Sequence, residues 1–127
     1  MLKSGENWGL EYKDGVVVGH FDEGLSREAF EEEIYPAFEE ILDVYREEIV
    51  ATADLVEVAE PFCNNVLGVW EQSARDSAQL PNFERAAIVA DRIKQLAVKN
   101  QLRVPGIEIE TFEDFDEAVE WARHGNS

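Results

Sequence analysis

The chain has 127 residues and a formal net charge of −17, with 28 Asp and Glu against 11 Lys and Arg. This length is typical of one domain, and the 45% apolar content is enough for a hydrophobic core, which argues against disorder. The negative charge repels phosphate backbones and anionic lipid headgroups, so nucleic-acid binding and membrane-surface attachment are poor hypotheses. We expect a single domain spanning residues 1–127.

The cysteine and histidine content is low. A lone cysteine, Cys63, cannot form an internal disulfide, and with two histidines it supplies too few ligands for a structural zinc site. The N-terminus has no apolar signal segment, and no stretch approaches the ~20 apolar residues of a membrane span. These features predict a cytoplasmic protein that needs no metal or other cofactor.

The acidic residues are dispersed along the chain rather than gathered in one tail. Salt screens the self-repulsion of such a surface, because the Debye length falls to about 3 Å at 1 M. A halophilic source explains this composition, and an ordinary acidic protein is the alternative. We favour the halophile, which predicts that stability rises with salt.

Two strands and a long helix are expected first. Residues 8–12 alternate apolar and polar, a Lys-Asp-Gly turn follows, and residues 16–21 form the second strand. Ser26 is a suitable N-cap for a helix with apolar residues at three- and four-residue spacings. Pro36 falls inside this helix, so we expect a kink or a break near Tyr35.

Strands and helices then alternate to the C-terminus. The expected strands lie within residues 48–58, at 84–90 and at 107–112, and the expected helices begin at Pro61, Asp91 and Asp114. In the helix after Asp91, Leu96 is expected to face inward. The order ββαβαβαβα predicts an α/β fold with a single mixed, mostly parallel sheet. The last strand alternates acidic and apolar residues, so the helices are expected mainly on one face of the sheet.

Five short segments, spread over nearly the whole chain, can be compared with the motifs of known families. They are residues 15–21 (GVVVGHF), 25–30 (LSREAF, with Tyr35-Pro36 a helix turn later), 83–91 (FERAAIVAD), 109–112 (IETF) and 117–121 (EAVEW). Together with the order of elements, they resemble the STAS-like domains of sulfate transporters and anti-sigma-factor antagonists, and most closely the SpoIIAA-like subgroup. The resemblance implies a STAS fold and a non-catalytic, regulatory role in protein–protein contact.

In the anti-sigma-factor antagonists, one loop carries Asp-Ser-Ser-Gly-Leu-Gly-Val-Leu, and one of its serines is phosphorylated. Residues 67–70 (LGVW) match the end of that motif, which places Cys63, Asn64, Asn65 and Val66 opposite Asp-Ser-Ser-Gly. Asparagine has no hydroxyl group to accept a phosphate. The resemblance therefore implies a regulatory module that lacks the phosphorylatable serine.

The same loop is the first candidate surface for a partner. Backbone N–H groups are unpaired at a helix N-terminus, and amide side chains flank them here, so Pro61, Cys63, Asn64, Asn65 and Val66 could hold a partner protein. The alternative is that the two asparagines only cap the helix or face solvent.

A basic stretch is the second candidate surface. Arg92, Lys94, Lys99 and Arg103 occur within residues 92–103, which contain no acidic residue. Such a cluster could dock an acidic surface, including that of a second copy of this chain. Complementarity to the helix dipole and simple solubility are the alternative explanations.

The aromatic residues on the expected helices allow another function. Phe38, Phe62 and Trp70 either belong to the core or line an apolar cavity for a small hydrophobic, lipid-like ligand. An enzyme would require His20 to lie in a cleft facing a second titratable group, and no catalytic motif is recognised. We expect a non-enzymatic protein-interaction module, with a carrier or sensor of a hydrophobic ligand as the alternative.

Overall fold

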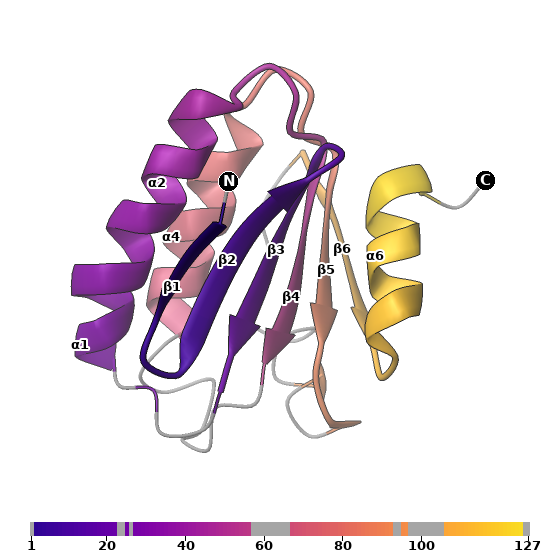
Figure 1. The fold of residues 1–127 in the computed structure, drawn as a ribbon. Helices are drawn as coiled ribbons and strands as arrows, with labels where there is room; N and C mark the ends of the chain where they lie inside the picture. The colour runs from indigo at the N-terminus through magenta and orange to yellow at the C-terminus, as the bar shows by residue number, and fades with distance from the viewer. Residues whose placement is uncertain are drawn as a thin grey trace.

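The computed structural model describes residues 2–22, 25, 27–56, 67–92, 95–96 and 106–125, with the backbone alone described for 67–70. Its strands are β1 (Leu2–Gly5), β2 (Trp8–Lys13), β3 (Val16–Phe21), β4 (Ala51–Val56), β5 (Arg85–Val89) and β6 (Glu108–Phe112). They form one sheet in the order β1-β2-β3-β4-β5-β6 (Figure 1). The pairs β1–β2 and β2–β3 are antiparallel, and the other pairs are parallel. The predicted mixed, mostly parallel sheet is confirmed.

The predicted hairpin is present, and its turn has the expected chemistry. Lys13 pairs with Val16, and the two residues between them, Asp14 and Gly15, have φ values of 50° and 87°. Two successive positive φ angles match the right-handed twist of the flanking strands, which is why Asp-Gly is favoured there.

Strand β1 was not predicted from the sequence. It pairs with β2 through a two-residue turn, where Asn7 has a φ of 66° and Gly5 lies opposite Trp8. Its four residues are largely exposed and show no apolar alternation, so the periodicity used to find the other strands is missing. It is a short edge strand that covers the side of β2.

The expected break near Tyr35 is confirmed as a change of helix type. Helix α1 (Arg27–Ala29) runs into the π-helix η1 (Phe30–Ile34), and α2 (Tyr35–Val44) then resumes α geometry with Pro36 in its first turn. Proline has no N–H and clashes with the carbonyl four residues earlier, so regular α geometry cannot continue through it. The expected cap, Ser26, lies outside the described residues.

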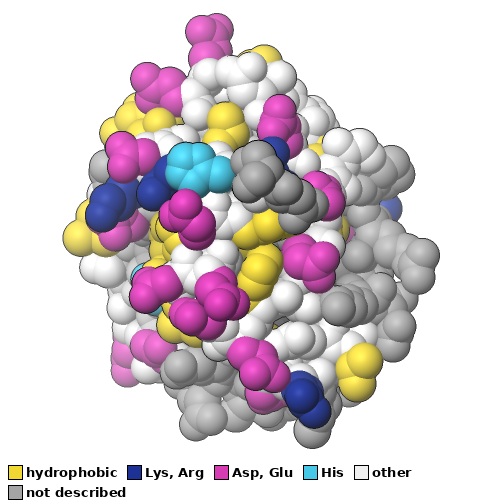
Figure 2. All heavy atoms as spheres, turned by 90° about the vertical axis from the view of Figure 1, so that its right-hand side faces the viewer, with side chains coloured by type: hydrophobic (Ala, Val, Ile, Leu, Met, Phe, Trp, Pro, Cys, Tyr) yellow, Lys and Arg dark blue, Asp and Glu magenta, His cyan; other side chains and the backbone are white. Residues whose placement is uncertain are grey.

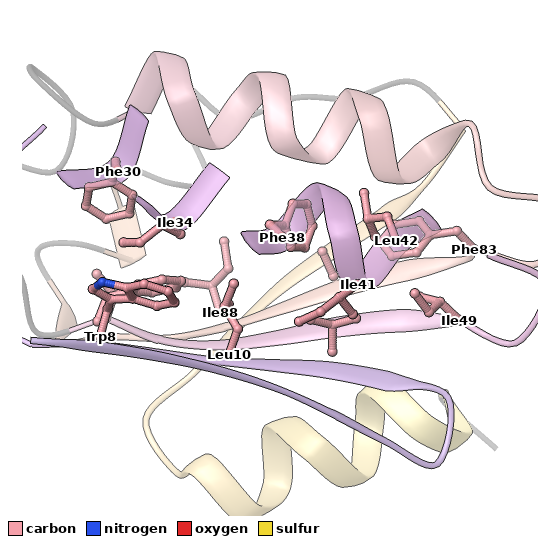
Figure 3. Packing of buried hydrophobic residues seen from close by; sticks show 14 of the residues in the cluster. Trp8, Leu10, Phe30, Ile34, Phe38, Ile41, Leu42, Ile49, Phe83 and Ile88 are labelled. Atoms are coloured by element: carbon pink, nitrogen blue, oxygen red, sulfur yellow. The ribbon is translucent and has the colours of Figure 1, made fainter. Parts of the chain in front are cut away.

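One face of the sheet is covered by α1, η1, α2 and α4 (Leu67–Ala78), which lie together in Figure 1. Figure 3 shows Phe30, Ile34, Phe38 and Leu42 pointing from this layer toward the sheet. They pack against side chains that include Trp8, Leu10, Val17, Phe21, Val56, Ala86 and Ile88. This is the larger hydrophobic core.

Among the described helices, α6 (Phe115–His124) alone covers the opposite face, so the helices lie mainly on one face, as expected. Its Ala118, Trp121 and Ala122 pack on Val16, Val18, Ala51, Ala53, Ala87 and Val89. Nη1 of Arg85 also donates to the carbonyl of Ala122 at 3.0 Å. The residues that the central strands present to α6 are small and apolar, which lets this helix pack closely on the second face.

The helix expected after Asp91 is described only at Arg92, Gln95 and Leu96. Leu96 is 61% exposed, so its expected inward orientation was wrong. Gln95 turns inward instead, and its Nε2 donates to the carbonyls of Ala90 (2.7 Å) and Phe112 (3.2 Å). Its Oε1 accepts from the hydroxyl of Thr111 at 3.3 Å, so the polar groups at the ends of β5 and β6 favour an amide at this position over an apolar side chain.

Candidate functional site

A small pocket lies between the sheet and the layer of α1, η1, α2 and α4. It has a volume of about 40 Å³ and is partly open to solvent. A space of this size admits a water molecule or the end of a small ligand. Its described lining residues are Leu10, Phe21, Phe30, Ile34, Tyr35, Phe38, Asp54 and Ser73.

The pocket contains one carboxyl group, that of Asp54 in β4. Side chains alternate along a strand, so Thr52, Asp54 and Val56 face the larger core while Ala51 and Ala53 face α6. Gly19 occupies the partner position on β3, and a Cβ there would lie 2.5 Å from Oδ1 of Asp54. The absence of a side chain at Gly19 thus makes the space that Asp54 occupies.

The environment of Asp54 favours the neutral form of its carboxyl. Burial raises the pKa of Asp54 from 3.8 to about 8, and no charged group among the described residues contributes to this shift. Although the pocket gives Asp54 partial access to solvent, protein atoms crowd its carboxyl group, which forms no hydrogen bond with any described residue. A carboxyl kept protonated in this way can donate a hydrogen bond at neutral pH, and it can also ionise when a cation approaches.

The π-helix supplies part of the pocket wall. Phe30 and Ile34 are both in η1, and Tyr35 and Phe38 follow in the first turn of α2. Single-turn π segments occur frequently at functional sites, because they rotate side chains away from regular helical positions. The change of helix type before Pro36 therefore sets the shape of the pocket.

A hydrogen bond beside the pocket joins α2 to α4. The hydroxyl of Tyr35 donates to Oδ2 of Asp76, and Nε2 of Gln72 donates to Oδ1 of the same carboxylate at 3.1 Å. Partial burial raises the pKa of Asp76. On the other side of Asp76, an open groove between the two helices is lined by Pro36, Glu39, Glu40, Leu42, Asp43, Arg46, Gln79 and Leu80. Tyr35 and Asp76 thus separate the apolar pocket from an acidic groove.

The predicted partner surfaces lie almost entirely outside the described residues. This holds for Pro61, Cys63, Asn64, Asn65 and Val66 of the first candidate and for Lys94, Lys99 and Arg103 of the second. Arg92 is described: its side chain is 90% exposed, and its Nε lies 3.4 Å from Oε1 of Glu113. Both surfaces remain predictions.

Of the residues predicted to line a ligand cavity, Phe38 lines the pocket described above. Phe62 and the side chain of Trp70 lie outside the description. His20, on which an enzymatic role would depend, packs against Phe115 with ring centroids 5.2 Å apart. It is on the α6 side of the sheet, across from Asp54 and its pocket.

Sequence reasoning missed Asp54, Gly19 and Tyr35. Asp54 stands within the run that predicts β4, and a charged residue inside a buried strand is itself a signal of function. Tyr35 was noted only as a helix break, although a tyrosine beside a proline break is well placed to direct its hydroxyl group out of the regular helix. The pairing of Gly19 with Asp54 depends on strand register, which local patterns do not reveal.

Acidic side chains are spread over the described surface. Figure 2 shows the side of the molecule on the right of Figure 1, where acidic side chains are spread among apolar ones. On and directly after the helices of the other face, the exposed acidic residues include Glu31, Glu32, Glu33, Glu39, Glu40 and Glu47. Within the described residues, no helix has the length and apolar character that crossing a membrane requires.

The fold and the pocket define a mixed α/β sheet domain with a small, mainly apolar pocket under one helical layer. The family model described as SpoIIAA-like matches residues 16–123. That match covers most of the chain, so the protein belongs to the SpoIIAA-like family, and its sheet and helices are those of a STAS-like domain. Membership indicates a regulatory role of the STAS type, and such domains are generally non-catalytic. Neither the curated proteins nor the solved structures provide a match.

Proposed function

We propose that this protein is a non-catalytic regulatory domain of the cytoplasm that binds a small, mainly apolar ligand in the pocket beside Asp54. The observation that carries the proposal is a carboxyl group without a hydrogen-bond partner among the described residues, in a pocket with mainly apolar walls. Asp54 is half-buried, so its carboxyl is less well hydrated than one on the open surface. A ligand that offers a hydrogen-bond partner there replaces this incomplete hydration with a direct contact.

The shape of the pocket supports the same proposal. Ligand sites are mostly apolar hollows with a few converging polar groups, and this pocket combines Phe30, Ile34 and Phe38 with Asp54 and Ser73. The volume of about 40 Å³ limits the enclosed part of the ligand to a few atoms, so the remainder lies toward the opening.

Native mass spectrometry of freshly purified protein tests this function. We expect a co-purifying small molecule on the wild-type protein and on Val44→Trp, which adds an indole at an exposed position of α2. Phe38→Trp, which puts the same bulk into the pocket wall, should lose it. Thermal melting followed by circular dichroism confirms that both variants are folded. If the wild-type protein carries no ligand and binds no short alkanol in solution, ligand binding is not the function of this pocket.

A second function is favoured by membership in the SpoIIAA-like family, whose regulatory domains act through protein contact. On this proposal, the segment from Pro61 to Val66 and the basic residues of 92–103 contact another protein or a second copy of this chain. Because Asn64 and Asn65 carry no hydroxyl, this contact operates without a phosphorylation switch at the loop.

A pull-down from lysate at native salt tests that contact. The wild-type protein should retain a partner that a variant with Asn64, Asn65 and Val66 replaced by alanine loses. Glu32→Ala, at an exposed position of η1, serves as the matched control and should retain it. Equal retention by all three proteins would contradict the proposal.

A further inference from the structure

The polar side chains in the described lining of the pocket carry oxygen atoms only. Asp54 presents a carboxyl, Ser73 and Tyr35 present hydroxyls, and Tyr35 leads to the carboxylate of Asp76. The described lining includes no lysine, arginine or histidine. A ligand with a carboxylate or phosphate group would therefore meet carboxyl oxygens with no cation to balance it, at a cost in binding free energy.

The charges around the pocket also favour a cationic ligand. The neighbouring groove is lined by Glu39, Glu40, Asp43 and Asp76, with Arg46 as the one cation in its described lining. The whole protein carries a net charge of −17. A field of this sign raises the local concentration of cations and speeds their association.

Resting on the ligand-binding function proposed above, we propose that the ligand is a small alkylamine-type cation, whose primary ammonium group binds the Asp54 carboxylate while its short apolar body contacts Phe30, Ile34 and Phe38. Because Gly19 has no side chain, the carboxyl of Asp54 can occupy this part of the pocket. No described side chain forms a hydrogen bond or an ion pair with that carboxyl.

Binding of such a cation is coupled to release of a proton. Among described residues, Tyr35 from α2 is the other titratable group that lines the pocket, and its hydroxyl leads to Asp76 from α4. Tyr12 and Tyr45 pack on the same face of the sheet but do not line the pocket. The neighbouring strands present Gly19, Phe21 and Ile88 there. Since burial raises the pKa of Asp54 to about 8, the carboxyl is neutral at pH 7 and gives its proton to the solvent as the ammonium ion binds.

Butylamine and butanol are matched probes, because they share the alkyl chain and differ in charge. Protein-observed NMR titrations of the full chain measure both dissociation constants. We expect butylamine to bind at least about tenfold more tightly than butanol at pH 8, since the paired charge is poorly solvated. The affinity for butylamine should rise about ninefold from pH 6 to 7 and about fivefold from pH 7 to 8, as the ionised fraction of a carboxyl with a pKa of about 8 does, and that for butanol should not rise.

Two variants separate Asp54 from the general surface charge. Asp54→Asn keeps the shape of the side chain and should abolish the preference for butylamine while butanol still binds, which also shows that the variant is folded. Glu32→Gln removes an equal charge at an exposed position of η1 and should keep the preference.

The outcomes distinguish this inference from the function on which it rests. Butanol binding as tightly as butylamine, or a preference for the amine that survives in Asp54→Asn, overturns the amine assignment and leaves ligand binding standing. Binding of neither probe to the wild-type protein overturns both. If Glu32→Gln loses the preference for butylamine as fully as Asp54→Asn does, the selectivity comes from the overall negative charge of the protein. That outcome also overturns the assignment of an amine ligand to Asp54.

Discussion

Gly19 of β3 and Asp54 of β4 occupy partner positions in adjacent parallel strands, and a Cβ at Gly19 would lie 2.5 Å from Oδ1 of Asp54. The same Cβ would lie 2.8 Å from the ring of Phe21. Glycine is normally unfavourable within a strand, and it commonly marks a position that another group must approach closely. The empty position at Gly19 therefore lets a carboxyl stand inside an otherwise apolar layer.

Replacing this glycine should strain the site. We expect Gly19→Ala to lower the free energy of unfolding by about 1–3 kcal/mol, because the new methyl group overpacks a buried region. Gly9→Ala is the control, since the nearest atom to its Cβ, the backbone oxygen of Lys3, is 3.9 Å away. Urea denaturation of the two variants measures the difference. Equal stabilities would show that Asp54 and Phe21 move aside freely.

Asp54 should make stability depend on pH. Between its unfolded pKa of 3.8 and its folded pKa of about 8, the folded protein binds more protons than the unfolded chain. Stability from this group is therefore full below pH 4 and is lost as the pH rises toward 8, by up to about 1.4 kcal/mol per unit. Asp54→Asn lacks this term, so its stability relative to the wild-type protein should increase from pH 5 to pH 8.

Urea denaturation of both proteins at each pH isolates the contribution of Asp54 to the free energy of unfolding, because the other carboxylates titrate alike in the two proteins. A difference that stays constant from pH 5 to pH 8 would mean that the carboxyl of Asp54 is ionised and solvated in the folded protein.

The contact between Tyr35 and Asp76 should stabilise the packing of α2 against α4. Tyr35→Phe removes the hydroxyl that donates to Oδ2 of Asp76, and we expect a loss of about 1–2 kcal/mol, as for a hydrogen bond to a charged group. A double-mutant cycle with Asp76→Ala separates this bond from the general effect of each substitution. Strictly additive losses would argue that the two side chains do not interact.

The dispersed acidic charge leads to a prediction about salt. With a net charge of −17, the melting temperature should rise between 0.1 and 2 M KCl as repulsion among carboxylates is screened. Chloride is preferable to sulfate for this series, because sulfate also strengthens apolar burial. A flat melting curve series would favour the ordinary acidic protein over the halophile.

Local sequence patterns were sufficient for most of the fold. The Asp-Gly turn, the β-branched run of β4 and the break before Pro36 each depend on interactions between residues close in the chain. Such interactions can be recognised from residue type and spacing alone. Composition likewise determined the acidic surface, and the short motifs were enough to identify the SpoIIAA-like family, which the match over residues 16–123 confirms.

The site depended on contacts that no local pattern contains. Asp54 meets Gly19 only because β3 and β4 pair in one register, and Tyr35 meets Asp76 across a gap of 41 positions in the chain. Likewise, α6 packs on the second face because the small side chains of Ala51, Ala53 and Ala87 leave room for it. The sequences of β4 and β5 alone are equally compatible with a sheet that has helices on one face. Register and helix placement result from packing the whole chain at once, so only the tertiary structure could bring a carboxyl, a tyrosine and an apolar wall into one pocket.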